Sequence, residues 1–120
     1  MEDFRFESLE VWKDSIEISD HLFRFADKAD EKRKYRFAEQ LRSATMSISN
    51  NIAEGSGSFF KKDFANFINI ARRSVFECVN ILYVFERQSI IEMEDVKGIY
   101  FPLLSLSKKL SSFRKTLLKE

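Results

Sequence analysis

The side chains that could take part in catalysis or metal binding are few and far apart in this sequence. His21 is the only histidine and Cys78 the only cysteine among 120 residues. A di-iron site in a helical bundle uses Glu-x-x-His on two helices, but Ile18 stands three residues before His21 and a second histidine is lacking. Cys78 lies within an apolar helical pattern, without the exposed cationic setting that activates a thiol. Residues 54–57, EGSG, lack the lysine and spacing of a phosphate-binding loop. The sequence therefore predicts a protein without enzymatic activity, metal ion, other cofactor or small-molecule substrate.

A line of polar side chains is the next feature that could take part in catalysis or binding. Its members recur at steps of three and four residues: Gln40, Ser43, Ser47, Asn51 and Glu54. On a helix this spacing places them along one face. Glu54 would face the negative end of the helix dipole, so a backbone amide or a cation should compensate it, with Arg42, Lys61 and Lys62 as candidates. We interpret the line as structural ties to the neighbouring turn, with an active site as the alternative.

The elements that position these residues are predicted to be helices. Three glycines and one proline leave little material for the turns of a sheet protein. The apolar spacing predicts an all-α fold, an antiparallel up-and-down four-helix bundle in one domain (residues 1–120), with helices over about 8–28, 35–54, 60–88 and 93–118. Ser8 is the expected first N-cap, residues 27–34 the first connection, and Gly55 the stop of the second helix. Pro102 predicts a kink in the last helix, or a break near Tyr100.

Apolar residues at steps of three and four define the predicted core face of each helix. The first helix offers two adjacent stripes: Leu9, Trp12, Ile16, Phe23 and Ala26, and beside them Val11, Ile18, Leu22 and Phe25. The later helices each offer one: Phe37, Leu41, Ala44, Ile48 and Ile52; Phe64, Ile68, Ala71, Val75, Cys78, Leu82 and Phe85; and Val96, Ile99, Leu103, Leu106, Leu110, Phe113 and Leu117. Such sustained seams are typical of helices that pack at a shallow angle.

The third predicted helix is apolar over more than its core face. Between residues 75 and 85 only Glu77 and Asn80 are polar. In a four-helix bundle each helix has one face toward solvent, so the extra apolar face with Phe76, Val79 and Tyr83 predicts contact with another subunit. The expected partner is therefore a second copy of the chain.

Several longer stretches together resemble a known family. They are AEQLRSATMSISNNIAEGSG (38–57), KKDFANFINIARRSVFECVNIL (61–82) and the entry LEVW (9–12). These stretches are similar to the four helix bundle protein family, the product of intervening sequences in bacterial large-subunit ribosomal RNA genes. The shared positions are Gln40, Leu41, Arg42, Ala44, Ser47, Ile48, Asn51, Ile52, Ala53, Glu54, Gly55, Phe67, Ala71, Ser74 and Glu77.

The resemblance implies a four-helix bundle, frequently a ring-shaped homopentamer, with no established enzymatic activity. It also marks a polar cluster, here called the family-motif residues: Gln40, Arg42, Ser47, Asn51, Glu54, Ser74 and Glu77. Two departures stand out. Residues 58–60, SFF, replace a basic residue and a Ser or Thr, which leaves Ser58 as the expected cap of the third helix, and Arg73 stands where a glycine is common.

Charge provides a second functional hypothesis. Residues 1–31 carry ten acidic and four basic side chains, whereas residues 32–87 carry five and ten. A related branch, the accessory variability determinant of diversity-generating retroelements, binds nucleic acid and a reverse transcriptase through a strongly basic surface, but this chain has a net charge of only +1. The candidate nucleic-acid-binding residues are Lys32, Arg33, Lys34, Arg36, Lys61, Lys62, Arg72 and Arg73, with Arg42, Lys108, Lys109, Arg114 and Lys115 as further basic side chains.

The sequence thus favours a non-enzymatic oligomeric bundle that acts as an assembly or adaptor module. The alternative is an accessory protein that binds RNA or DNA weakly and without sequence preference. The N-terminus lacks a basic segment followed by an apolar run, and the longest apolar stretch, VFECVNILYVF (75–85), is short. We therefore expect a cytoplasmic protein that does not enter a membrane.

Overall fold

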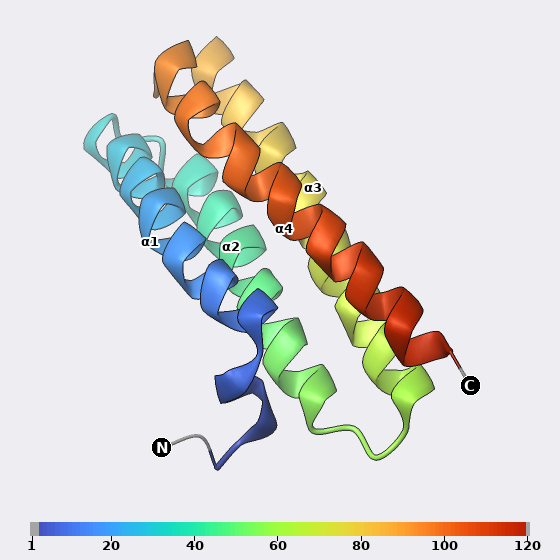
Figure 1. The fold of residues 1–120 in the computed structure, drawn as a ribbon. Helices are drawn as coiled ribbons and strands as arrows, with labels where there is room; N and C mark the ends of the chain where they lie inside the picture. The colour runs from blue at the N-terminus through green and yellow to red at the C-terminus, as the bar shows by residue number, and fades with distance from the viewer. Residues whose placement is uncertain (1–2, 120) are drawn as a thin grey trace.

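The computed structural model describes residues 3–119, which form four long helices and one short turn of 3-10 helix. The 3-10 turn η1 (Arg5–Ser8) precedes α1 (Glu10–Glu31), α2 (Tyr35–Ser56), α3 (Lys61–Arg87) and α4 (Met93–Leu118). Successive helices run antiparallel and lie side by side in a bundle 48 Å long (Figure 1). The predicted all-α class and the packed four-helix bundle are confirmed.

The core lies along the bundle axis, where the predicted seams of α2, α3 and α4 meet. Every seam residue of α3 is buried, and so are those of α2 and α4 apart from the partly exposed Phe37 and Phe113. Aromatic rings join the helices at both ends of the core. Phe37 lies 6.3 Å from Phe85, and Phe64 lies 5.2 Å from Phe113, between ring centroids. Burial of these side chains supplies most of the driving force for the fold.

The two stripes proposed for α1 contribute unequally to the core. The buried residues are Val11, Ser15, Ile18, Ser19, Leu22, Ala26 and Ala29. From the first stripe, Ala26 is buried, and Leu9 and Trp12 are partly buried and pack against the core. Ile16 is 40% exposed and Phe23 is partly exposed, so these two positions were wrong as core residues. The two buried hydroxyls are satisfied within the helix, because Ser15 donates to the carbonyl of Trp12 at 2.7 Å and Ser19 to that of Ser15 at 2.6 Å.

Both ends of α1 differ from the expectation. Ser8 belongs to η1, where its hydroxyl donates to the Arg5 carbonyl at 3.1 Å, and Leu9 precedes the first turn of α1 without a side-chain cap. At the other end the helix continues to Glu31, so the connection to α2 is short and turns at Arg33, whose φ is 60°. Ala29 is fully buried, so the last, highly charged part of α1 still contributes one side chain to the core.

The connection between α2 and α3 also corrects two predictions. Gly55 does not stop α2, because it is buried inside the last turn of a helix that ends at Ser56. Ser58 does not cap α3 directly, since its hydroxyl donates to the Asp63 carboxylate at 2.9 Å and Phe60 precedes the first turn. The helix therefore begins without a side-chain cap.

Helix α4 is continuous through Pro102, so the break near Tyr100, one of the two alternatives for this proline, is wrong. Proline removes one backbone donor and crowds the carbonyl four residues earlier. Here that earlier residue is Gly98, and both residues are exposed, so water can satisfy the carbonyl. None of the helices within residues 3–119 is long and apolar enough to cross a membrane.

Candidate functional site

Three of the family-motif residues form a chain of hydrogen bonds between α2 and α3. Asn51 donates from Nδ2 to the hydroxyl oxygen of Ser47 at 3.0 Å and to its carbonyl at 2.7 Å. The hydroxyl oxygens of Ser47 and Ser74 are 2.8 Å apart, and Ser74 donates to the carbonyl of Ile70 at 3.0 Å. Because the Ser74 proton is used on that carbonyl, Ser47 is the donor to Ser74. Neither hydroxyl is left as a free nucleophile, and the arrangement fixes the register of the two helices.

The two side chains with the most obvious reactivity, Cys78 and His21, lie on different helices. Cys78 is fully buried, with its Sγ 3.9 Å from the hydroxyl of Thr45, and burial raises the pKa of this thiol to about 12. His21 is exposed on α1, where its Nδ1 lies 3.0 Å from the Arg24 guanidinium. Within residues 3–119, no three His, Cys, Asp or Glu side chains are arranged to hold a metal ion.

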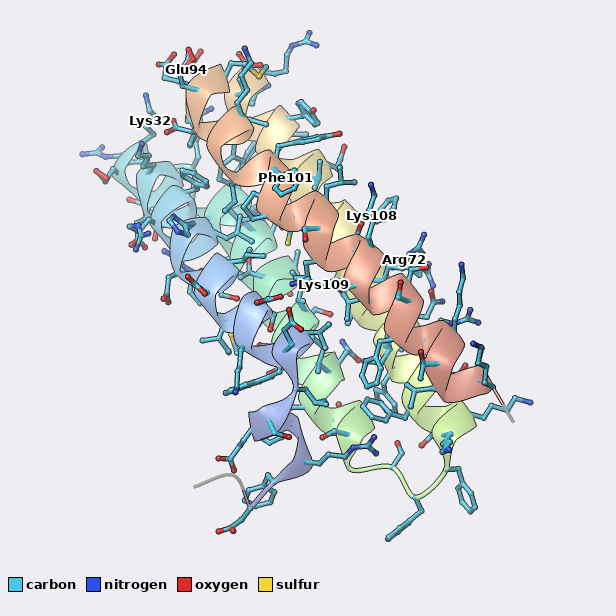
Figure 2. The ribbon with its side chains drawn as sticks, viewed as in Figure 1. Lys32, Arg72, Glu94, Phe101, Lys108 and Lys109 are labelled. Carbon is cyan, nitrogen blue, oxygen red and sulfur yellow. The ribbon has the colours of Figure 1, made fainter. Side chains whose placement is uncertain are left out.

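The candidate nucleic-acid-binding residues are dispersed over the molecule. Lys32, Arg33, Lys34 and Arg36 lie at the connection between α1 and α2, whereas Lys61 and Lys62 open α3 at the opposite end. Helix α2, 22 residues long, separates these groups by about 33 Å at 1.5 Å per residue. Figure 2 shows Lys32 near one end of the bundle and Arg72 along its side. Arg73 is exposed next to Arg72. The fold does not join these cations into one patch.

An exposed apolar surface lies along α3 and α4. It contains the three residues proposed for subunit contact, of which Phe76 is 57% and Tyr83 43% exposed while Val79 is partly buried. Tyr100 (44% exposed) and Leu104 (37%) of α4 extend it, and a hollow of about 160 Å³ lies between the two helices. We call these five residues the α3/α4 face. The two α4 residues were missed from the sequence, although each flanks the buried seam position Leu103.

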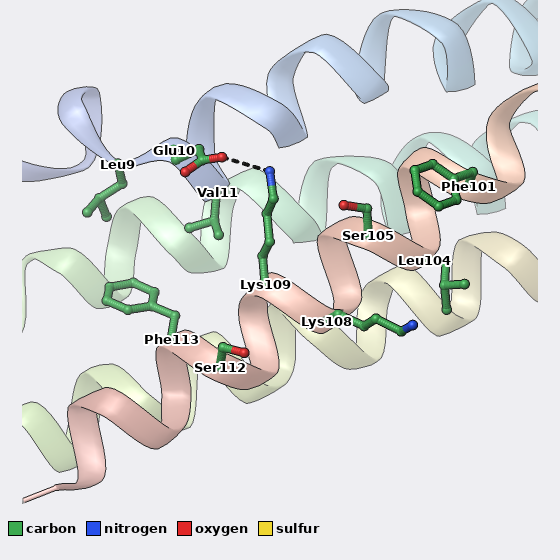
Figure 3. Close-up of a pocket in the computed structure, with 10 residues that line it drawn as sticks. All are labelled: Leu9, Glu10, Val11, Phe101, Leu104, Ser105, Lys108, Lys109, Ser112 and Phe113. Atoms are coloured by element: carbon green, nitrogen blue, oxygen red, sulfur yellow. Dashed lines mark hydrogen bonds and ion pairs between the residues drawn. The ribbon is translucent and has the colours of Figure 1, made fainter.

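A second apolar depression lies between α1 and α4, the neighbouring helices that pack least closely. It has a volume of about 520 Å³, and Leu9, Val11, Phe101, Leu104 and Phe113 are among the residues that line it (Figure 3). Lys109 spans this opening, because its Nζ lies 2.7 Å from Glu10 Oε1 and 2.9 Å from Asp14 Oδ2.

The two carboxylates raise the pKa of Lys109 above its ordinary value by accepting hydrogen bonds from the ammonium. Lys109 therefore holds α1 to α4, and its charge is already compensated within the subunit. The sequence did not suggest this role for Lys109, because Glu10 and Asp14 lie far from it along the chain.

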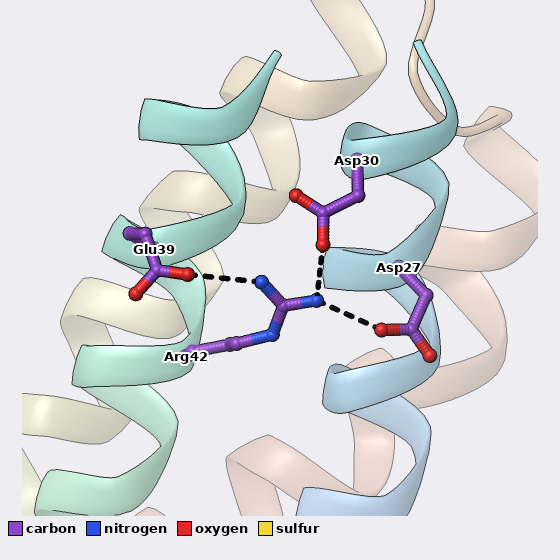
Figure 4. A network of polar contacts seen from close by, with 4 residues as sticks. All are labelled: Asp27, Asp30, Glu39 and Arg42. Carbon is purple, nitrogen blue, oxygen red and sulfur yellow. Dashed lines mark hydrogen bonds and ion pairs between the residues drawn. The ribbon is translucent and has the colours of Figure 1, made fainter. Parts of the chain in front are cut away.

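Arg42 of α2 joins this helix to α1 through Asp27 and Asp30, and it also pairs with Glu39 of its own helix (Figure 4). Its Nη2 lies 2.6 Å from Asp30 Oδ2 and 2.8 Å from Asp27 Oδ1, and its Nη1 lies 3.0 Å from Glu39 Oε1. Hydrogen bonds to Asp30 and Asp27 raise the pKa of Arg42 above its ordinary value. This Arg42 network explains why the acidic run after residue 26 continues as helix: Asp27 and Asp30 lie one turn apart and face the same guanidinium.

The remaining family-motif residues, Gln40, Glu54 and Glu77, are exposed. Within residues 3–119, neither carboxylate forms an ion pair or hydrogen bond in the subunit. Arg42, a candidate partner of Glu54, is used by the α1 carboxylates instead. The family motif is thus divided into side chains that hold helices together and side chains that project outward.

The fold and these surfaces define the class: an elongated four-helix bundle whose motif hydroxyls are engaged in helix packing and whose apolar residues extend onto its sides. The chain belongs to the family described as 23S rRNA-intervening sequence protein, whose model matches residues 7–112. The resemblance noted from the sequence is confirmed. A comparison with curated proteins finds no significant match.

Proposed function

We propose that this protein is a non-enzymatic assembly or adaptor module that works as a homo-oligomer. The observation that carries the proposal is the α3/α4 face, where aromatic and aliphatic side chains of two helices are exposed together. An apolar patch with a polar surround is typical of protein interaction surfaces. A closed ring of copies, with the five subunits that the family resemblance implies, is the assembly we expect.

The arrangement of the motif residues supports a role without catalysis. Ser47 and Ser74 use their hydroxyl protons within the chain of hydrogen bonds between α2 and α3. Cys78, with its raised pKa, is buried as a neutral thiol. Exposed Glu54 and Glu77 remain free to contact a protein partner or another copy.

Light scattering on the purified chain tests the proposal. We expect a particle several times heavier than the 14.2 kDa subunit. Replacing Phe76 with Glu should dissociate it, because the substitution removes an aromatic ring from the centre of the face and places a charge where the contact excludes water. Phe59→Glu is the matched control, since Phe59 is 99% exposed in the connection outside the α3/α4 face. A wild-type particle of one subunit would contradict the proposal.

Nucleic-acid binding is the second candidate, favoured by the four basic residues around the α1–α2 connection. Lys32, Arg33 and Arg36 are exposed there. In a ring these groups would repeat around one rim, and many weak contacts with phosphates add up through multivalency. Three acidic residues, Glu31, Glu92 and Glu94, lie at the same end of the bundle. Because this end carries charges of both signs, we expect its binding to nucleic acid to be weak and independent of sequence.

A further inference from the structure

We propose that one end of the bundle, here called the bundle tip, binds the surface of an anionic lipid bilayer. The tip consists of the connection between α2 and α3, the first turn of α3 and the end of α4. Its exposed apolar and basic residues are Phe59, Phe60, Lys61, Lys62, Leu118 and Lys119. Figure 1 shows the connection and the C-terminus at the same end of the molecule. Adsorption to a bilayer surface needs no spanning helix, so it differs from the membrane insertion that the apolar pattern of the sequence argues against.

Phe59 and Phe60 are the most exposed large apolar side chains among residues 3–119. Phe59 is 99% and Phe60 75% exposed. The core at this end is closed without them, because the next phenylalanine, Phe64, is buried and its ring lies 5.2 Å from that of Phe113 on α4. Leu118, 42% exposed, adds an aliphatic side chain from the last turn of α4. Adjacent rings left in water mark a surface that gains free energy when an apolar medium covers it.

The lysines beside the rings carry charges that the subunit leaves uncompensated. Within residues 3–119, none of Lys61, Lys62 and Lys119 takes part in an ion pair. Helix α4 offers them no carboxylate, since residues 96–119 contain no aspartate or glutamate. This end of the described chain carries the basic residues Arg5, Lys61, Lys62, Arg114, Lys115 and Lys119 and the acidic residues Asp3, Glu7, Glu54 and Asp63. The basic excess attracts the headgroups of anionic lipids.

The hydroxyl groups of the connection are already engaged, which favours a lipid surface over a nucleic acid. Ser56 donates to the carbonyl of Ala53 at 2.7 Å, and Ser58 donates to the Asp63 carboxylate at 2.9 Å. The groups left free are therefore the rings and the ammonium ions. Bases cover only the faces of a ring on which they stack. The headgroup region of a bilayer instead surrounds a projecting ring on all sides and presents phosphates to the lysines next to it.

Co-sedimentation of the full chain with lipid vesicles tests this binding. At low salt we expect the chain to bind vesicles of phosphatidylglycerol and phosphatidylcholine in equal parts, and to bind vesicles of phosphatidylcholine alone only weakly. Phe59→Ser combined with Phe60→Ser should reduce binding by at least about tenfold, because both rings lose their apolar contact. The helix should be retained in this variant, since serine is a favourable residue directly before the first turn of α3.

Phe101→Ser is the matched control for the lost ring. Phe101 is 73% exposed, close to Phe60, but lies along the side of the bundle, away from the tip (Figure 2). We expect this variant to bind vesicles like the parent chain. Fluorescence gives a second readout with Phe59→Trp, after replacement of Trp12, the only tryptophan, by phenylalanine. Its emission should shift to shorter wavelength when anionic vesicles are added, whereas that of Phe101→Trp should stay unchanged.

The lysines are tested by a change of charge at each end of the bundle. Lys61→Gln combined with Lys62→Gln should lower binding to anionic vesicles by about fivefold per lysine, and this difference should diminish as salt rises. Lys32→Gln combined with Arg33→Gln removes the same charge at the opposite end. This control should bind vesicles like the parent chain.

Three results would overturn membrane binding by the tip. The first is a parent chain that does not bind anionic vesicles, or a double serine variant that binds them equally well. The second is loss of RNA binding in the double serine variant without vesicle binding by the parent, which would assign the rings to base stacking. The third is loss of assembly in that variant in light scattering, which would assign the rings to a contact between subunits. Vesicle binding that fails while assembly still depends on Phe76 would leave the proposed function in place.

Discussion

Gly55 of α2 lies so close to Phe67 of α3 that an ideal Cβ on the glycine would be 2.5 Å from the Phe67 Cβ. The same added atom would lie 2.9 Å from Cδ1 of Phe64. Real Cβ atoms do not approach other carbons this closely, so α2 and α3 can come together at this end only because residue 55 has no side chain. The glycine is needed for a close helix contact and not for a left-handed turn, since no glycine among residues 3–119 has a positive φ.

Gly55→Ala should therefore destabilise the protein, by about 1–3 kcal/mol as is usual when a packed site is overfilled. Gly98→Ala is the matched control. Gly98 also lies within a helix, but an added Cβ there would meet nothing within 4 Å, so the better helix propensity of alanine should stabilise by up to about 1 kcal/mol. Urea unfolding of both variants measures the difference. Opposite signs are expected, and a stabilised Gly55→Ala would contradict the close contact.

Arg42→Met should lower the free energy of unfolding by about 1 kcal/mol, because it removes ion pairs that are partly exposed and leaves Asp27, Asp30 and Glu39 crowded together. Arg42→Lys should recover little, since one ammonium cannot reproduce the forked geometry of the guanidinium. Exposed Arg73 serves as control, and Arg73→Met should change stability by less than about 0.5 kcal/mol. Chemical denaturation at low and high salt would show whether the Arg42 loss diminishes as charges are screened.

Glu54→Gln and Glu54→Ala should both leave the subunit's stability within about 0.5 kcal/mol of the parent value. The carboxylate is exposed near the negative end of α2, so its removal can even stabilise slightly. The measurement is best made in the Phe76→Glu background, where loss of assembly does not complicate unfolding. A large loss for alanine with glutamine retained would instead reveal a hydrogen-bond partner for Glu54.

Stability should also depend on the buried Cys78 thiol at alkaline pH. Its folded pKa of about 12 exceeds the ordinary value of 9.0, so above pH 9 the unfolded chain loses a proton that the folded chain keeps. The contribution of this group is therefore complete below pH 9 and falls as pH rises toward 12, by up to about 1.4 kcal/mol per pH unit. Urea unfolding across this range should show a steeper decline for the parent protein than for Cys78→Ala. Parallel curves would show that the thiol ionises equally in both states.

Nucleic-acid binding should be weak and should fall as salt rises, because a nearly neutral subunit neutralises few phosphates. Fluorescence anisotropy with structured RNA and with duplex DNA, at low and physiological salt, measures this dependence. Replacing Lys32, Arg33, Lys34 and Arg36 with glutamine should reduce both the affinity and its dependence on salt. Tight, salt-resistant binding of one RNA would favour a dedicated RNA-binding role over assembly.

The sequence alone determined the helices of this protein and most of its core. The seam positions from Phe64 to Phe85 could be predicted because a helix repeats every 3.6 residues, so spacing along the chain states which side chains share a face. The same spacing identified Phe76 and Tyr83 as apolar residues that lie outside the core face of the helix. These properties depend on residues close together in the sequence, which is why they needed no knowledge of the neighbouring helices.

The tertiary structure decided what each polar or small residue contacts. Spacing aligned Ser47 with Glu54, but only the position of α3 shows that Ser47 is tied to Ser74 while Glu54 projects into solvent. Likewise, the partners of Arg42 lie 12 and 15 residues away, on α1. Position 55 must be glycine because α3, which follows it in the sequence, packs closely against it. Hydrogen bonds and close approaches join specific atoms of different helices, so they depend on the height and rotation of each helix against its neighbour, which periodicity within one helix does not determine.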